Sequence, residues 1–452
     1  MRSSPATASP AAVPGGDPAP LAVAQFRRWL PALWLAGVRG VAIVLQFASQ
    51  VVVGLLAGAS GVGILQLATS WICVVGEFLA LGLPARAMRQ VAVDHANDNK
   101  TAIASLLASS AHRILKLSAV LLLVFVGVLL LSRLSGLFAL ERHHVLMSVA
   151  VLLGAPCFAL MKLYAESLKA SGKVLFAVGF ESLSSPVTLL LLSAICWVLG
   201  ATLVAAALVA AFLLSVALAA LAMRVGLSQA LCRMGNESRP GREGDHHQHT
   251  DLLFLWVSSL LSIVFLNLPF LLMPLFISTA DIGVFSIAHK LLNVVTTLLL
   301  LMAAVYGPKF ARAYAAGDSA ALASTLRQTQ LISCAVFLPA SGLLVLFANP
   351  LAGLFGAEFE GLQGLLLILC AGQLVNAITG LSGVLLNMTG AAARELIALA
   401  AAITFCVVGT AWLGDSQGAV GLVAVFSASI ALKNVASWLL ARYSLNAMGK
   451  RT

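Results

Sequence analysis

Four ionisable side chains interrupt apolar stretches of the sequence. They are the cations Arg39, Lys290 and Lys433 and the carboxylate Glu77. A charge at the centre of a membrane helix costs about 2.5–3.5 kcal/mol on insertion scales, so such groups face a water-filled cavity or pair within the helix bundle. Because the cations outnumber the carboxylate, the chemistry we expect is recognition of an anion, such as a diphosphate or an acidic sugar.

Uncharged polar side chains recur on the same helix faces as these charges. Residues at i, i+4, i+7 and i+11 share one face of a helix. Five runs in the sequence have this or a closely related spacing: Arg39, Ile43, Gln46 and Gln50; Gln66, Ser70, Cys73 and Glu77; Ser286, Lys290, Asn293 and Thr297; Gln373, Asn376, Gly380, Gly383 and Asn387; and Ser429, Lys433 and Ser437. A lone polar residue usually packs between helices, whereas a run on one face is typical of an aqueous path. The predicted substrate pathway comprises Arg39, Gln46, Glu77, Lys290, Asn293, Gln373, Asn376 and Lys433. An alternative for two of them is a structural ion pair between Arg39 and Glu77.

A second group of charges lies near the expected cytoplasmic ends of the fourth and fifth apolar stretches. Glu166 and Glu181 are close in sequence to Lys162, Lys169 and Lys173. Opposite charges at a membrane boundary commonly form salt bridges while remaining partly hydrated. We therefore expect interfacial salt bridges there.

The elements that must position these residues are transmembrane helices. The chain has 452 residues, of which 60% are hydrophobic and 10% are charged, whereas about 25% of a typical soluble domain is charged. A membrane span needs about 20 mostly apolar residues, and with this measure the sequence predicts an all-α polytopic protein of about 12 transmembrane helices. The spans are expected to start near Leu30, Gly63, Ile114, Val145, Val174, Ala201, Leu252, Gly283, Thr329, Leu362, Glu395 and Gly418.

Lysine and arginine residues gather in alternate loops between these spans. The opposite loops contain only Arg133 and Arg142. Positively charged loops stay in the cytoplasm, so we predict a multi-pass protein of the bacterial inner membrane with both termini cytoplasmic. The net charge of +10 then reflects membrane orientation, and we expect no nucleic-acid partner. The external turns are expected around Gly58, Gly200, Thr279 and Gly414.

Two pairs of segments recur at nearly the same separation. Residues 61–68 resemble 281–288, and residues 168–172 resemble 386–390. The helices of the first pair are both expected to end at a proline followed by basic residues, Pro84 and Pro308. The recurrence favours two parallel six-helix repeats around a central cavity; the alternative is a coincidental similarity of apolar helices. The predicted parts are a disordered cytoplasmic tail (1–29), an N-terminal six-helix lobe (30–227), a cytoplasmic linker (228–250), a C-terminal six-helix lobe (251–446) and a cytoplasmic tail (447–452).

Motifs for catalysis, cofactor binding and metal binding are missing from the sequence. The nearest match to a phosphate-binding loop, residues 171–174, lacks both the first glycine and the hydroxyl residue of that motif. The seven cysteines lack the spacing of a metal site or a disulfide framework. The short external turns leave no room for a catalytic domain. We expect neither enzymatic activity nor a cofactor or metal.

By their order and spacing, three segments resemble the multidrug/oligosaccharidyl-lipid/polysaccharide exporter superfamily, and within it the polysaccharide flippase branch. They are residues 55–89, with Gly58-Ala-Ser-Gly61-Val-Gly63 and Leu81-Gly82-Leu83-Pro84, residues 283–291 and residues 386–390. The resemblance covers the chain from Leu30 to Asn446.

This resemblance implies a two-lobed carrier that works by alternating access. Its cargo would be an undecaprenyl-diphosphate-linked oligosaccharide, carried across the inner membrane for the synthesis of O-antigen and lipopolysaccharide, capsule or exopolysaccharide. Arg39, Lys290 and Lys433 would contact the diphosphate or an acidic sugar. The lipid tail would stay in the bilayer, and the partner enzymes would be a polysaccharide polymerase and glycosyltransferases.

Two other functions stay open. One is a cation-coupled multidrug or metabolite exporter of the same fold, which would be favoured by carboxylates for coupling, although Glu77 is the only central one. The other is a membrane-bound polysaccharide polymerase or ligase. Such enzymes usually need a sizeable external loop with catalytic arginine or histidine residues, which this chain lacks.

Overall fold

The computed structural model describes residues 18–97, 99–135, 142–199, 205–232 and 248–449, and every regular element in these ranges is a helix. Ten helices among the described residues are long and apolar enough to cross a membrane. Two of them cover 44 and 57 residues, which is enough for two crossings each at about 20 residues per crossing. The predicted all-α polytopic fold, with about 12 crossings, is confirmed.

The two longest helices each contain two membrane crossings that are joined at a single glycine. They are α1 (Pro18–Ala80) and α13 (Ala392–Gly449). Gly58 in α1 has φ 67° and ψ −177°, and Gly418 in α13 has φ 56° and ψ −150°. This region of backbone space is essentially restricted to glycine, so the chain bends back there without a loop. One turn was expected near Gly414, but that residue continues the helix against Phe276.

Eleven further helices complete the described part of the chain. Between the two long helices they are α2 (Leu83–Ala96), α3 (Lys100–Ser135), α4 (Arg142–Ala170), α5 (Val174–Val198), α6 (Ala205–Cys232), α7 (Gln248–Leu272), α8 (Thr279–Ala315), α9 (Ser319–Leu346), α10 (Ala348–Phe355), α11 (Leu362–Thr379) and α12 (Ser382–Met388). Two 3-10 turns, η1 (Met273–Leu275) and η2 (Ala357–Phe359), connect some of them.

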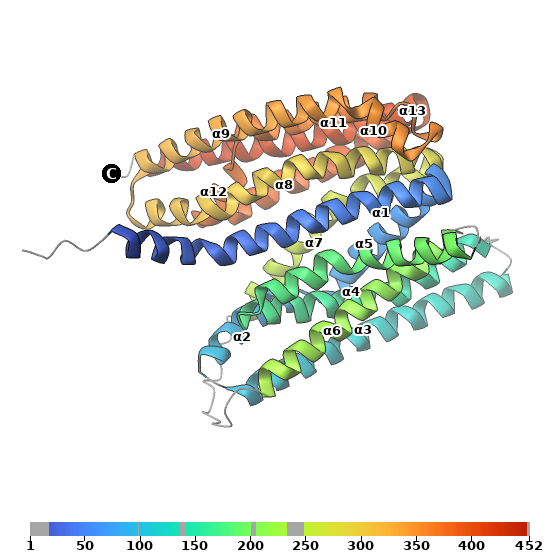
Figure 1. Cartoon of the computed structure of the whole chain (residues 1–452), viewed down its shortest axis with the longest axis horizontal. Helices are drawn as coiled ribbons and strands as arrows, with labels where there is room; N and C mark the ends of the chain where they lie inside the picture. The colour runs from blue at the N-terminus through green and yellow to red at the C-terminus, as the bar shows by residue number, and fades with distance from the viewer. Residues whose placement is uncertain (1–17, 98, 136–141, 200–204, 233–247, 450–452) are drawn as a thin grey trace, which may run out of the picture.

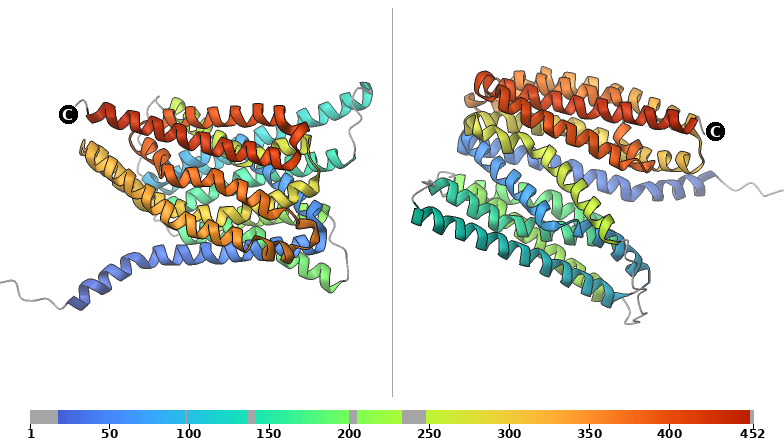
Figure 2. Two further views of the ribbon diagram at one scale, coloured as in Figure 1. Left: turned by 90° about the horizontal axis from the view of Figure 1, so that it is seen from above. Right: turned by 180° about the vertical axis from the view of Figure 1, so that it is seen from behind.

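The helices form two groups that lie close together at one end of the molecule and separate toward the other. Figure 1 shows α8, α9, α11 and α13 beside the first segment of α1, and α3, α4, α5 and α6 in the second group. The view from behind in Figure 2 shows the same separation. We call the end that carries Gly58 and Gly418 the kink end, and the end that carries the C-terminus the terminal end. The groups meet at the kink end.

The internal repeat leaves a reciprocal contact at the kink end. A Cβ atom on Gly63 would overlap the carbonyl oxygen of Thr279, and a Cβ atom on Gly283 would overlap the carbonyl oxygen of Ala59. Ala59 corresponds to Thr279 at the same offset that relates Gly63 to Gly283. Each glycine thus contacts the residue that precedes the other glycine by four positions. Two equivalent units related by a two-fold axis make reciprocal contacts of this kind. The second segment of α1 and the start of α8 therefore touch backbone to backbone.

The two proline positions differ from each other. The prediction that a helix ends at Pro308 was wrong, because α8 continues through this residue to Ala315. A proline leaves one helical carbonyl without its hydrogen bond, and membrane helices tolerate this defect because neighbouring groups satisfy the carbonyl. At the other position α1 ends at Ala80, and Pro84 lies in the first turn of α2, where its missing N–H costs nothing.

Some sequence-based expectations lie outside the described residues. They are the tail up to residue 17, the turn at Gly200 and most of the linker, residues 233–247. The division of the chain into two lobes at residues 228–250 stays a prediction.

Candidate substrate cavity

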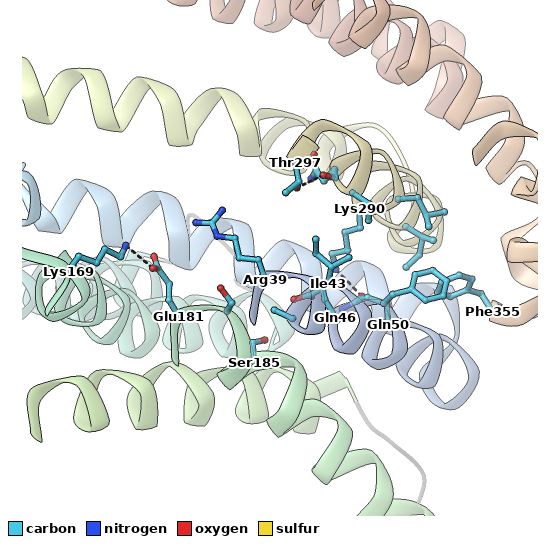
Figure 3. A pocket seen from close by; sticks show the side chains of 17 residues that line it. Arg39, Ile43, Gln46, Gln50, Lys169, Glu181, Ser185, Lys290, Thr297 and Phe355 are labelled. Atoms are coloured by element: carbon cyan, nitrogen blue, oxygen red, sulfur yellow. Dashed lines mark hydrogen bonds and ion pairs between the residues drawn. The ribbon is translucent and has the colours of Figure 1, made fainter. Parts of the chain in front are cut away.

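A cavity of 570 Å³, lined by both polar and apolar side chains, lies between the first segment of α1, the adjoining parts of α4 and α5, the middle of α8 and the end of α10. Figure 3 shows its side chains. They are Arg39, Ala42, Ile43, Gln46, Phe47, Gln50, Lys169, Glu181, Ser182, Ser185, Ile287, Lys290, Leu291, Asn293, Val294, Thr297 and Phe355. The rings of Phe47 and Phe355, with centroids 5.6 Å apart, form the part of the wall nearest the kink end.

The α1 side of the cavity is one continuous helix face. Arg39, Ile43, Gln46 and Gln50 all line it, as expected from their spacing along a helix. The α1 segment thus supplies one cation and two amides. Its apolar neighbours on the other faces, such as Val44, are exposed on the outside of the bundle.

The α8 side supplies Lys290, Asn293 and Thr297. The remaining member of that sequence run, Ser286, is fully buried and donates its hydroxyl to the carbonyl of Gly283 over 2.9 Å. The polar run on α8 therefore has two functions. Its first turn belongs to the contact at the kink end, and the following turns line the cavity.

Arg39 and Lys290 are the cations of the cavity without a carboxylate partner among the described residues. Lys290 Nζ donates to Gln50 Oε1 over 2.9 Å, which connects α8 to α1. The salt bridges found across the described part of the chain involve Lys162, Lys169 and Lys433. Because an ammonium has three N–H donors, Lys290 retains donors for a further acceptor.

Several side chains that line the cavity were not predicted from the sequence. Lys169 Nζ lies 2.9 Å from Glu166 Oε1 and 2.9 Å from Glu181 Oε2. These salt bridges were predicted, but Lys169 and Glu181 also line the cavity, together with Ser182 and Ser185. The i, i+4 spacing of Glu181 and Ser185 on α5 was the available signal.

Four predicted pathway residues do not line this cavity. Glu77 Oε2 accepts from Lys162 Nζ at 2.6 Å, so the alternative of an Arg39–Glu77 pair was wrong. Lys433 Nζ lies 2.6 Å from Glu395 Oε1. Gln373 Oε1 accepts from Asn376 Nδ2 on the same helix, at 3.0 Å. Helical periodicity identifies a polar face, but it does not say which neighbouring helix covers that face.

The arrangement suits an anion attached to a polyhydroxylated group. Arg39 and Lys290 can donate charge-assisted hydrogen bonds, which are stronger than neutral ones. The amides and hydroxyls of the cavity can both donate and accept, as sugar hydroxyls require. Clusters of three or more histidine, cysteine or carboxylate side chains that could hold a metal do not occur among the described residues.

Neither a family model nor a curated protein sequence matches this chain. Solved structures do match. One is an inward-facing conformation of a multidrug resistance MATE family transporter of the MOP superfamily, with a TM-score of 0.71 and 16% identity over 90% of this chain and 96% of that chain. The chain has the fold of the MOP superfamily transporters.

Two further solved structures also match the chain. One is a MOP superfamily transporter from Pyrococcus furiosus, with a TM-score of 0.62 and 18% identity over 92% of this chain and 96% of that chain. It is described by a reverse polarity of its binding pocket that suggests a different function. The lipid II flippase MurJ in an inward closed conformation has a TM-score of 0.59 and 13% identity over 91% of this chain and 87% of that chain. At these identities the likeness concerns the fold alone.

An outward-facing conformation of a MATE family transporter also matches, with a TM-score of 0.58 and 17% identity over 93% of this chain and 95% of that chain, against a TM-score of 0.71 for the inward-facing one. In this chain, the helix groups meet at the kink end and separate toward the terminal end (Figure 1).

Proposed function

We propose that this protein carries an undecaprenyl-diphosphate-linked oligosaccharide across the bacterial inner membrane by alternating access. The proposal is based on the presence of Arg39 and Lys290 in one membrane cavity, where neither has a carboxylate partner in the part of the chain that the structure describes. Charges inside a membrane are costly unless they are compensated. An anionic cargo compensates them when it binds.

The uncharged lining of the cavity supports a glycan as the other part of the cargo. Its amides and hydroxyls come from both sides, for example Gln46 on α1, Ser185 on α5 and Asn293 on α8. A volume of 570 Å³ is in the range of about 300–1,000 Å³ that is usual for small-molecule sites. That space accommodates a diphosphate and the first sugars, while the polyprenyl tail stays in the bilayer.

Alternating access would use the two helix groups. The group of α3–α6 and the group of α8, α9, α11, α13 and the first segment of α1 would tilt against each other around the cavity, and the contact of Gly63 and Gly283 would open as the terminal end closes. Basic residues such as Arg86 in α2, Lys309 in α8 and Arg442 in α13 belong to the segments that the positive-inside rule places at the cytoplasmic side. The terminal end would therefore face the cytoplasm, where the cargo would be made, and the carrier would serve cell-surface polysaccharide synthesis.

The second candidate function is export of cationic drugs or metabolites. It is favoured by the MATE transporters with the same fold and by the carboxylate of Glu181 in the cavity wall. This carboxylate forms a salt bridge with Lys169 at 2.9 Å, and Arg39 and Lys290 add positive charge that repels a cationic drug.

The deciding experiment follows lipid-linked sugars in cells that lack the gene. Wild type, Arg39→Ala, Lys290→Ala and the control Lys309→Ala, an exposed cation outside the cavity, are each returned to these cells. We expect deletion to trap undecaprenyl-linked oligosaccharide in the cytoplasmic leaflet. Wild type and the control should release it, whereas the two cavity variants should not.

An unchanged surface glycan and unchanged lipid precursors after deletion would reject a sugar-lipid cargo. Greater sensitivity of the same cells to cationic drugs would then favour the exporter.

A further inference from the structure

Lys169 differs from the other paired lysines of the described chain because it is shared by two carboxylates. Glu166 lies on the same helix, three residues before it, and Glu181 lies on the neighbouring helix α5, each at 2.9 Å. Lys162 and Lys433 each have one carboxylate partner, Glu77 and Glu395. The group of Lys169 therefore has one negative charge in excess when all three side chains are ionised.

The salt-bridged group of Lys169 also faces the cavity. Lys169 and Glu181 line it (Figure 3), whereas the two single pairs do not. The Glu181 side chain is 31% exposed, compared with 4% for Glu77 and 13% for Glu395. Glu181 is thus accessible to solvent and to a ligand, and it can leave Lys169 without becoming a dehydrated charge.

The position of Glu181 gives it an effect on any anion in the cavity. Its carboxylate lines the same space as the guanidinium of Arg39 and the ammonium of Lys290. A carboxylate there repels an anionic ligand and occupies an N–H of Lys169 that the ligand could use. A carrier must bind its cargo tightly enough to load and weakly enough to release it, as in other membrane conduits.

We infer that Glu181 is a built-in competitor for the anionic group of the cargo. In the empty cavity its carboxylate binds Lys169; when cargo enters, the anion replaces it, and Lys169 becomes the third cation of the site beside Arg39 and Lys290. Glu166 keeps its contact with Lys169 from the same helix. When the cargo leaves, Glu181 returns to Lys169 and prevents rebinding. This inference rests on the proposed function and makes Glu181 the residue that sets the affinity for the anion.

The test measures binding of farnesyl diphosphate to the full-length protein in nanodiscs, by calorimetry. Glu181→Gln removes the competing charge but keeps the size of the side chain, so we expect affinity to rise by about tenfold. Glu395→Gln is the matched control, because it removes an equal charge from a paired glutamate outside the cavity. It should change the affinity less than twofold. Glucuronate in place of farnesyl diphosphate shows whether the anion is a diphosphate or an acidic sugar.

A second readout separates competition from a structural role. Tighter binding slows release, so Glu181→Gln should lower KM for transport of the diphosphate-linked lipid and also lower kcat. A variant that merely weakens the fold would lower kcat without tightening the binding of the probe.

The outcomes distinguish this inference from the proposed function. If farnesyl diphosphate binds wild type through Arg39 and Lys290, and Glu181→Gln binds it equally or more weakly, the competitor role is overturned and the proposed function stands. If neither anion binds wild type or Glu181→Gln, the proposed function fails, and the competitor role fails with it.

Discussion

Helices α1 and α8 meet in two different ways, at the kink end and around the cavity. At the kink end the glycines at positions 63 and 283 let backbone touch backbone, without a polar side chain between them. Around the cavity, Lys290 of α8 and Gln50 in the first segment of α1 form a hydrogen bond of 2.9 Å between flexible side chains. A backbone contact is either made or broken, because packed surfaces deform little. Side chains around a cavity can instead exchange partners one at a time.

The kink end also has one charged contact between segments far apart in sequence. Glu358 in η2 accepts a hydrogen bond from the backbone N–H of Ala59 over 2.7 Å, at the start of the second segment of α1. A carboxylate is favourable at a helix N-terminus, where N–H groups lack partners within the helix. Glu358 therefore stabilises the closed kink end in addition to the glycine contact.

The largest effect is expected from breaking the glycine contact. In Gly63→Leu the new side chain would overlap the carbonyl oxygen of Thr279, and overpacking of this kind costs about 1–3 kcal/mol or more. We expect transport to fall below a tenth of the wild-type rate while the protein still reaches the membrane. Gly127→Leu is the control, since a Cβ at that position has nothing within 4 Å. Equal transport by the two variants would show that the contact is dispensable.

The next largest effect is expected from removing a cation of the cavity. Lys290→Met keeps the length of the side chain but loses the charge and the bond to Gln50. Hydrogen bonds to charged groups contribute about 1.5–3 kcal/mol, so binding of farnesyl diphosphate should weaken by about ten- to a hundredfold. Titration calorimetry measures this loss, with Lys309→Met as the control. A change below twofold would remove Lys290 from the anion site.

A smaller effect is expected at the amides of the cavity wall. Gln46→Ala removes neutral donors and acceptors, which contribute about 0.5–1.5 kcal/mol each. The affinity for a diphosphate lipid with sugars attached should fall by about two- to tenfold, and that for farnesyl diphosphate alone should not change. Competition between the two lipids in one assay measures this difference. Equal losses for both lipids would mean that Gln46 does not recognise the glycan.

The smallest effect is expected from Glu358→Gln, which keeps an acceptor for the Ala59 N–H but removes the charge. We expect the kink end to open about two- to fivefold more often, given the strength of charges at helix N-termini. The rate at which a maleimide labels a cysteine introduced at Val62, a fully buried position in the contact, reports this opening. Glu360→Gln is the neighbouring control, and it should leave the labelling rate unchanged.

Much of the fold could be predicted because a bilayer imposes a simple rule on sequence. Long apolar segments must be helices, since lipid offers no partner for the backbone, and this requirement yielded the span count. The end of α8 was misplaced because Pro308 interrupts the hydrogen bonding but not the path of the helix. The turn at Gly418 was placed a helical turn early, because Gly414 and Gly418 look equivalent in sequence, although only Gly418 has a positive φ.

Prediction of the site was less complete, for a physical reason. Arg39, Gln46, Lys290 and Asn293 line the cavity because their helices border it. Lys433 has the same spacing of polar neighbours, but it meets Glu395 from another part of the same long helix. Whether a polar face meets water or another polar side chain depends on tertiary packing, which periodicity does not contain.

The glycine bends at positions 58 and 418 also affect how the chain enters the membrane. Each bend joins two crossings without a loop, so the insertion machinery receives the two crossings of each pair within 44 or 57 residues. We expect each pair to insert as a single hairpin, so that biogenesis depends on one backbone conformation that glycine adopts at the least cost.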